Sequence, residues 1–210
     1  MKVKKWFFAL LWIVLSRSGL PGQSESLRNE KVVVREVNVL SGDQFPLPPD
    51  RAGVAIHLDA GMTEHIAQGG NPRSAAVQRG DTVFYKSGSG TLRNAGAKAF
   101  RIVWIEFTGK GSPESWGVTG LSPKYKPLFE NQYVRAYDIR IAAGTSEPWH
   151  SHRDRVVVCL SGAEVVHEMP DGRKETSSLK TGEIGWRRGG THIGHNLGKT
   201  DLWVIAVEPK

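Results

Sequence analysis

Residues 144–162 read GTSEPWHSHRDRVVVCLSG and place two histidines just before an apolar run. Successive side chains of a β-strand point to opposite faces, so His150 and His152 are expected on the same face. The run from Arg155 to Leu160 is rich in β-branched residues and ends at Ser161-Gly162, a turn signal. The segment therefore predicts two neighbouring imidazoles at the start of a buried strand.

The chain repeats itself with a period of 102 residues, apart from a compensated slip near Gly61 and Gly162. Several matched positions are Gly or Pro, where the backbone is most constrained. The matches include Asn29 with Asn131, Gly42 with Gly144, Pro46 with Pro148, Gly80 with Gly182, Asn94 with Asn196, and Glu106 with Glu208. A repeat of this length indicates an internal duplication of two similar units.

Each half reads as short strands separated by turns, and the 24 Gly and 11 Pro of the chain fit that pattern. No segment after the N-terminus keeps a helical period. Strands are expected over 100–107 in the first half, and over 133–141, 155–160, 164–169, 184–186 and 202–207 in the second. We therefore expect an all-β chain of two barrels, at 29–108 and 128–210, joined by a linker at 109–127.

A second histidine group, THIGHN, occupies residues 191–196. It follows the turn at Gly182 and a short strand, where a β-barrel would return a side chain to the same interior. We expect His192 to join the first two histidines there. We expect His195 to be a loop residue, and His167, beside a hairpin turn, to lie at the surface.

The first half has lost these histidines. At the positions of His150, His152 and His192 it carries Pro48, Asp50 and Gly90, and none of these supplies a neutral nitrogen ligand. The fold therefore does not need histidines at these positions, which favours a functional role for the cluster in the second half.

Together these residues resemble the two sequence motifs of the cupins. Gly144, His150-x-His152 and Gly162 follow the first motif, and Gly182, Gly189, His192 and Asn196 follow the second. The resemblance covers nearly the whole chain once the repeat is counted. It implies two cupin-type β-barrels, a bicupin whose N-terminal half is degenerate.

The resemblance also implies a metal site in the C-terminal barrel. It implies that His150, His152 and His192 hold one divalent transition metal per chain, with Fe, Mn, Ni, Zn and Cu all open because imidazole suits each. The Glu that cupins usually carry after the two histidines is missing, and Asp154 would be a poorly placed fourth ligand. Arg155, Trp149 and Trp186 flank the motifs as candidate pocket residues, with core packing or surface exposure as the alternative for each.

The first 22 residues are typical of a secretory signal peptide. Three lysines precede a ten-residue apolar core, Trp6 to Leu15, and small residues follow. Cleavage is expected after Ser18 or Gly22, and the alternative is an uncleaved N-terminal helix. We therefore expect a secreted or periplasmic protein without stable membrane insertion after cleavage, because the core is shorter than a bilayer-spanning helix.

Charge and cysteine content limit the partners. Cleavage after Gly22 removes four basic residues and lowers the formal net charge from +7 to +3. With no basic cluster interleaved with aromatic residues, the chain is not expected to bind nucleic acid. Cys159 is the single cysteine and cannot form an intramolecular disulfide, so we expect it to pack as a small apolar residue.

Three functions stay open from the sequence. The first is a metal-dependent enzyme acting on a small molecule, and some cupin dioxygenases resemble this chain in using three histidines for Fe(II). The second is a non-catalytic cupin that binds a small ligand or the metal itself. In the third, the histidines are relics. The expected partner is a small-molecule ligand, and a homodimer is left open.

Overall fold

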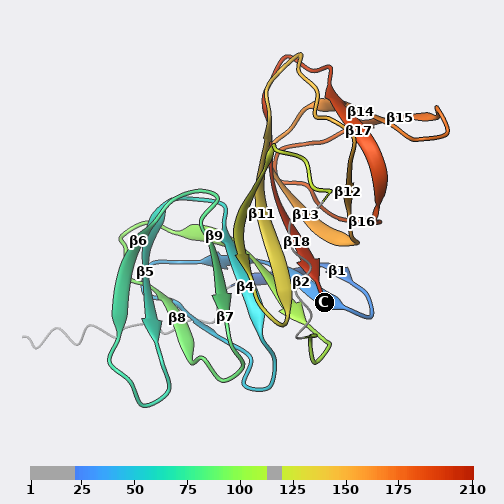
Figure 1. The fold of residues 1–210 in the computed structure, drawn as a ribbon. Helices are drawn as coiled ribbons and strands as arrows, with labels where there is room; N and C mark the ends of the chain where they lie inside the picture. The colour runs from blue at the N-terminus through green and yellow to red at the C-terminus, as the bar shows by residue number, and fades with distance from the viewer. Residues whose placement is uncertain (1–21, 113–119) are drawn as a thin grey trace, which may run out of the picture.

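The computed structural model describes residues 22–112 and 120–210, and these ranges contain strands and turns without a helix (Figure 1). Within them no helix is long and apolar enough to cross a bilayer. The expected signal peptide, apart from Gly22, lies outside the described residues. The all-β fold class predicted from the sequence is confirmed.

The first half of the chain forms two antiparallel sheets. Its strands are β1 (Gly22–Arg28), β2 (Val32–Val39), β3 (Gln44–Pro46), β4 (Gly53–His57), β5 (Gly61–Ile66), β6 (Arg73–Val77), β7 (Thr82–Tyr85), β8 (Thr91–Asn94) and β9 (Phe100–Phe107). Five strands pair in the order β1-β2-β9-β4-β7, and four pair in the order β3-β8-β5-β6.

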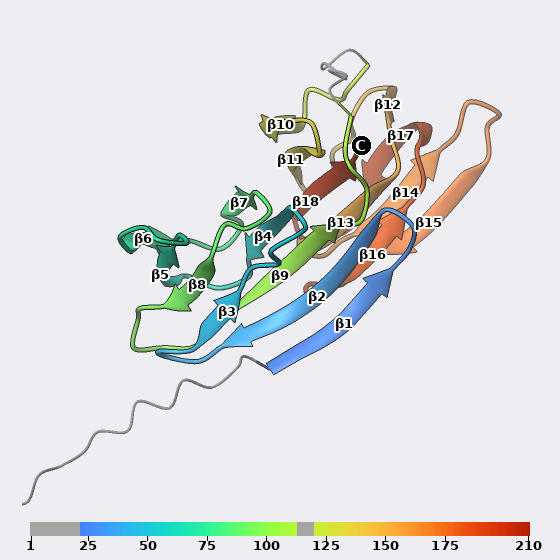
Figure 2. The ribbon, with the colours of Figure 1, turned by 90° about the horizontal axis from the view of Figure 1, so that it is seen from below.

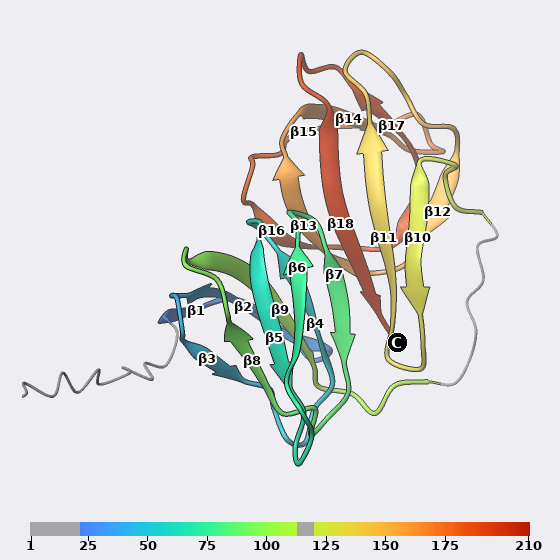
Figure 3. The ribbon, with the colours of Figure 1, turned by 90° about the vertical axis from the view of Figure 1, so that its left-hand side faces the viewer.

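The second half repeats this arrangement strand for strand. Its strands are β10 (Tyr125–Glu130), β11 (Val134–Ile141), β12 (His150–His152), β13 (Arg155–Ser161), β14 (Glu164–Glu168), β15 (Lys174–Ser178), β16 (Ile184–Arg187), β17 (Gly190–Asn196) and β18 (Leu202–Pro209). The sheet orders are β10-β11-β18-β13-β16 and β12-β17-β14-β15 (Figure 3).

Two strands lie wholly or partly outside the limits expected for the two barrels. β1 precedes the expected start of the first barrel at residue 29, and β10 begins at Tyr125, inside the expected linker. Both are end strands of their sheets. β1 is exposed along nearly its whole length, so it carries no alternation of apolar and polar residues that would announce a strand.

The two five-stranded sheets pack against each other and join the halves. Val156 and Val158 of β13 belong to an apolar cluster that includes Val54 and Ile105 of the first half. The alternate residues Val157 and Cys159 face the interior of their own barrel. β13 is thus buried on both faces, which explains its uninterrupted apolar sequence. Figure 2 shows β1, β2 and β9 running beside β13 and β16.

Equivalent polar contacts recur in the two halves. The Asn94 amide donates to the carbonyls of Val39 and Lys98, and Asn196 donates to those of Ile141 and Thr200, all at 2.8–2.9 Å. Each amide thereby bridges two loops of its barrel. These matched contacts agree with the repeat seen in the sequence.

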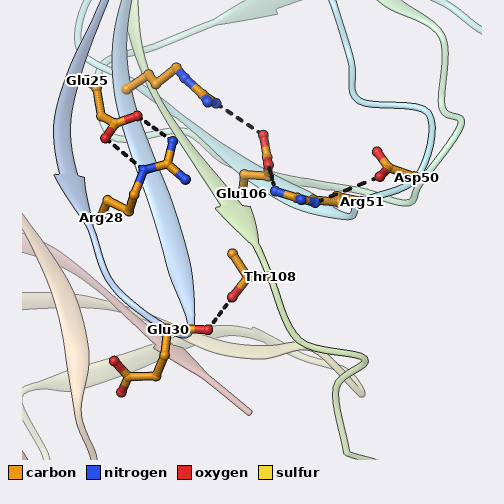
Figure 4. Close-up of polar contacts among 8 residues, drawn as sticks. Glu25, Arg28, Glu30, Asp50, Arg51, Glu106 and Thr108 are labelled. Carbon is orange, nitrogen blue, oxygen red and sulfur yellow. Dashed lines mark hydrogen bonds and ion pairs between the residues drawn. The ribbon is translucent and has the colours of Figure 1, made fainter.

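Buried glutamates at equivalent positions also recur. Glu106 accepts from Arg51 at 2.6 Å and from Arg35 at 3.1 Å (Figure 4). Its counterpart Glu208 is fully buried and pairs with Arg135 at 2.6 Å. An ion pair therefore lies at the same end of each barrel interior.

Candidate metal centre and cavity

Three histidines meet inside the second barrel. The pairing of β12 with β17 sets His150 opposite His192, and His152 lies two residues further along β12 on the same face. All three side chains are buried, and one ring nitrogen from each lies within 4.8 Å of the others. His195 points to the other face of β17, where its Nδ1 lies 2.7 Å from the Ser146 hydroxyl, so it is a strand residue and not the expected loop residue.

Hydrogen bonds fix the orientation of two of these rings. Nδ1 of His150 lies 3.0 Å from the Pro148 carbonyl, and Nδ1 of His152 lies 2.9 Å from the Arg153 carbonyl. A carbonyl only accepts, so each Nδ1 carries the proton and each Nε2 keeps its lone pair. Nε2 of His192 is buried and has no hydrogen-bond partner among the described residues.

Burial keeps the cluster neutral. It lowers the pKa of His152 to about 2 and that of His192 to about 3, with the Arg155 charge adding to both shifts. Burial also lowers the pKa of His150. Metal ions bind the neutral imidazole, so no proton has to leave these rings before an ion binds near neutral pH.

Glu147 is a site residue that the sequence reasoning missed. Its carboxylate lies 3.5 Å from Nε2 of His150 and is almost fully buried. It occupies space left by Gly194, where a Cβ would approach the carboxylate to 2.5 Å. Burial raises the pKa of Glu147 to about 7, against a smaller lowering by the hydrogen bond from Ser122. The carboxyl group beside the histidines therefore comes from Glu147, which precedes His150 in the sequence, and not from a residue that follows His152.

Tyr125 and His167 were also missed. The Tyr125 hydroxyl accepts from Arg155 at 2.9 Å and lies 3.0 Å from Nε2 of His150, to which it donates. Burial raises the pKa of Tyr125 to about 12, so this donor keeps its proton. His167 is half-buried, not a surface residue, and its ring centroid is 4.6 Å from that of His192. The inward-facing Val165 two residues earlier is the signal that could have placed His167 inside.

His152, His167 and His192 border a cavity of about 310 Å³ inside the barrel. Arg155 lines it, as expected, together with Glu147, Tyr125 and His167. Much of the remaining wall is apolar and comes from Ile139, Ile141, Val157, Val165, Leu202 and Val204. The second barrel therefore combines a polar end with an apolar interior large enough for a small molecule.

Three of the expected pocket residues lie outside this cavity. Asp154 accepts from the Gly189 backbone N–H at 2.6 Å and so ties two loops together. Trp149 is 49% exposed. Trp186 packs on the apolar cluster between the halves, because it sits on the opposite face of β16 from the cavity-lining Arg187. None of these three side chains faces the three-histidine cluster.

The first barrel is filled where the second is hollow. Trp104 occupies its interior, with ring centroids 5.5 Å from Phe45 and 6.1 Å from Tyr85. It fits because Gly53 has no side chain, since a Cβ there would approach the indole to 2.3 Å. The equivalent residues of the second barrel are Ala206 and Arg155. The first barrel thus has Trp104 beside Gly53, where the second barrel has the small Ala206 and the charged Arg155.

The donor set fits a divalent transition metal. The buried Nε2 of His192, which has no hydrogen-bond partner among the described residues, and the free Nε2 lone pair of His152 could each bind a metal ion. The Glu147 carboxyl group lies beside His150. Three imidazoles leave coordination positions open, which is typical of catalytic rather than closed structural sites. These ligand types alone do not choose among Fe, Mn, Ni, Zn and Cu.

Comparisons with known proteins agree with this architecture. No protein-family model and no curated protein matches the chain. Among solved structures, it is similar to a cupin 2 conserved barrel domain protein from Leptotrichia buccalis, with a TM-score of 0.59 and 12% identity over 94% of this chain and 92% of that one. AerE from Microcystis aeruginosa gives a TM-score of 0.62 and 12% identity over 91% and 97%.

A third similar structure is the oxalate decarboxylase of Bacillus subtilis, a protein with Mn(II) centres. It gives a TM-score of 0.58 and 12% identity over 86% of this chain and 69% of that one. Identities this low show the fold alone. The chain shares the fold of these cupin structures, and its second barrel brings together three histidines that can hold a metal ion.

Proposed function

We propose that the chain is an exported, metal-dependent cupin enzyme that acts on a small molecule in the cavity of its second barrel. The observation that carries the proposal is the set of three buried, neutral imidazoles beside that cavity. A bound divalent ion would act as a Lewis acid toward substrate oxygen atoms or as a site for O₂. Oxygen insertion by a dioxygenase, isomerisation and elimination are the reaction types we consider.

The side chains of this barrel would then position the substrate and move protons. Glu147 is placed to exchange a proton with a molecule bound beside His150, since its carboxyl group already lies 3.5 Å from that ring. Tyr125 offers a hydroxyl donor at the same place. The apolar walls exclude water from the rest of the ligand, which strengthens every polar contact at the histidine end.

A non-catalytic binding protein is the second candidate. The observation that favours it is the missing carboxylate after the two histidines, where cupin enzymes usually carry Glu. In that case the cavity would hold a ligand without changing it. A homodimer also stays a proposal, which sedimentation velocity would test.

Reconstituted protein separates the two candidates. The chain is loaded in turn with Fe, Mn, Ni, Zn or Cu and incubated with a panel of small organic acids, with and without O₂, using His152→Ala as the metal-site control. Metal-dependent turnover that His152→Ala abolishes supports the enzyme. Ligand binding without turnover by any metal form supports the binding protein. Export is tested separately by N-terminal sequencing, where a chain that still begins at Met1 contradicts it.

A further inference from the structure

The cavity contains a buried positive charge that the protein does not neutralise. Arg155 is 7% exposed and forms no ion pair among the described residues. Its Nη1 donates to the Tyr125 hydroxyl, and its Nε is buried without a hydrogen-bond partner. Burying an unpaired guanidinium is unfavourable, so such a group is expected to meet an anion.

Among the buried arginines of this barrel, the lack of an ion pair is particular to Arg155. Arg135, buried in the same interior, is paired with Glu208 at 2.6 Å. Arg187 also lines the cavity, and Glu183 at 2.8 Å compensates its charge. Glu147 lies 3.5 Å from His150 but forms no ion pair with Arg155. Arg188 also lines the cavity but is exposed to solvent, so Arg155 is the buried cation of the cavity that is left for a ligand.

We propose that Arg155 binds the carboxylate of a small organic acid whose hydrocarbon body lies on the apolar wall of the cavity. This inference rests on the proposal that the second barrel is a small-molecule site. Two observations carry it: the buried guanidinium that has no ion-pair partner among the described residues, and the apolar side chains that line the same cavity. A guanidinium matches a carboxylate in shape and offers it several N–H donors.

The size of the cavity limits the acid. Its volume of about 310 Å³ lies at the lower end of ligand pockets, which span roughly 300–1,000 Å³. The lining combines Arg155 and two of the clustered histidines with the apolar side chains of Ile139, Val165 and Leu202. A monocarboxylate with a short aliphatic or aromatic body satisfies both parts.

Comparison of the two barrels supports this assignment. In the first barrel, Gly53 takes the place of Arg155, and Trp104 fills the space that a ligand would need. The arginine and the cavity therefore occur together in one half and are both absent from the other. A structural role of the arginine in the barrel fold does not account for that, because the first barrel forms the same sheets without it.

Binding of hexanoate and of its uncharged analogue hexanamide tests the proposal. Both are titrated calorimetrically into the metal-free protein and into the Zn²⁺-loaded protein, for the wild type, Arg155→Gln, Arg155→Lys and the control Arg173→Gln. Arg173 lies in the exposed β14–β15 turn, paired with Asp171. Thermal unfolding and zinc content of each variant report whether the fold and the metal site survive the change.

We expect metal-free wild type to prefer hexanoate over hexanamide by about 10- to 100-fold, the range for a charge-assisted hydrogen bond. Arg155→Gln should remove the preference, Arg155→Lys should keep part of it, and Arg173→Gln should keep all of it. Equal binding of the two probes by the wild type, no binding of either, or a preference that survives in Arg155→Gln overturns the proposal. If the preference for hexanoate depends on Arg155 but the protein takes up no zinc, the carboxylate site is supported. The same result contradicts the proposal of a metal-dependent enzyme.

Discussion

His150 on β12 lies directly opposite His192 on β17, and the centroids of the two rings are 4.7 Å apart. His152 completes the group, with its ring centroid 4.9 Å from that of His192. The cluster thus depends on the pairing of two short strands that are far apart in the sequence. Each ring contributes one neutral nitrogen, so the loss of any one leaves two ligands.

Removal of one ligand should empty the metal site. We expect His152→Ala to lower metal content from one ion per chain to less than about one tenth, because two imidazoles hold an ion far less firmly than three. His195→Ala is the matched control on β17, since its ring faces Ser146 on the other side of the strand. Elemental analysis after dialysis measures both, and unchanged content in His152→Ala contradicts the assignment.

Displacement of Glu147 should weaken the metal site without removing a ligand histidine. A Cβ at Gly194 would approach the Glu147 carboxylate to 2.5 Å and push this flexible side chain aside. We expect Gly194→Ala to lower metal affinity about 10- to 100-fold, as loss of a group that supports the ligands does. Gly190→Ala on the same strand is the control, because a Cβ there meets nothing within 4 Å.

Competition with a chromogenic chelator gives the two affinities. Equal affinities in Gly194→Ala and Gly190→Ala would show that Glu147 does not support the ion. Glu147→Ala, measured in the same way, should reproduce the effect of Gly194→Ala, since both changes remove the carboxylate from the histidines.

The buried His57 of the first barrel should make stability depend on pH. Both of its ring nitrogens lack partners among the described residues, and burial lowers its pKa to about 4. The unfolded chain binds this proton at about pH 6.5, so stability is lost as the pH falls from about 6.5 to 4. The contribution is about 3 kcal/mol, from the difference of the two pKa values.

The variant His57→Leu removes this pH-dependent contribution to the free energy of unfolding. Urea unfolding at pH 7 and pH 4 should show the variant gaining about 3 kcal/mol relative to the wild type at the lower pH. The same difference between variant and wild type at both pH values would show that His57 takes up its proton equally easily in the folded and unfolded chain.

The two amides that bridge loops should contribute equally to stability. Asn94 and Asn196 are both buried and each donates to two backbone carbonyls. We expect Asn94→Ala and Asn196→Ala each to lower the free energy of unfolding by about 2–4 kcal/mol, because each leaves two carbonyls without their donor. Denaturant unfolding measures both losses. A loss confined to one barrel would argue against equivalent roles in the two halves.

Much of the fold was readable from the sequence because central strands of the five-stranded sheets, such as β4 and β13, are buried on both faces. Their apolar runs, such as Arg155 to Ser161, stand out against polar turns with Gly. β1 and β10 were missed because end strands are shaped by pairing with a neighbour, not by their own pattern. The expected start of the first barrel at residue 29 therefore left out all of β1, and the expected end of the linker at residue 127 divided β10.

His150 and His152 were predictable because their spacing matches the two-residue repeat of a strand, and His192 because it follows a turn and a short strand in a cupin-like motif. Glu147 was not, because its approach to His150 depends on the conformation of the segment before β12 and on the missing side chain of Gly194. Trp186 and Trp149 were misplaced for a related reason. Position next to a motif does not say which face a side chain takes, and only the strand pairing decides that.

Anomalous diffraction from crystals of the metal-loaded chain, recorded at the absorption edge of the bound metal, tests the central claim most directly. We predict one peak per chain, about 2.0–2.2 Å from a ring nitrogen of each of His150, His152 and His192. No peak is expected in the first barrel, where Pro48, Asp50 and Gly90 stand at the equivalent positions. A fully occupied ion elsewhere in the chain, or an empty cluster at saturating metal, would contradict the account.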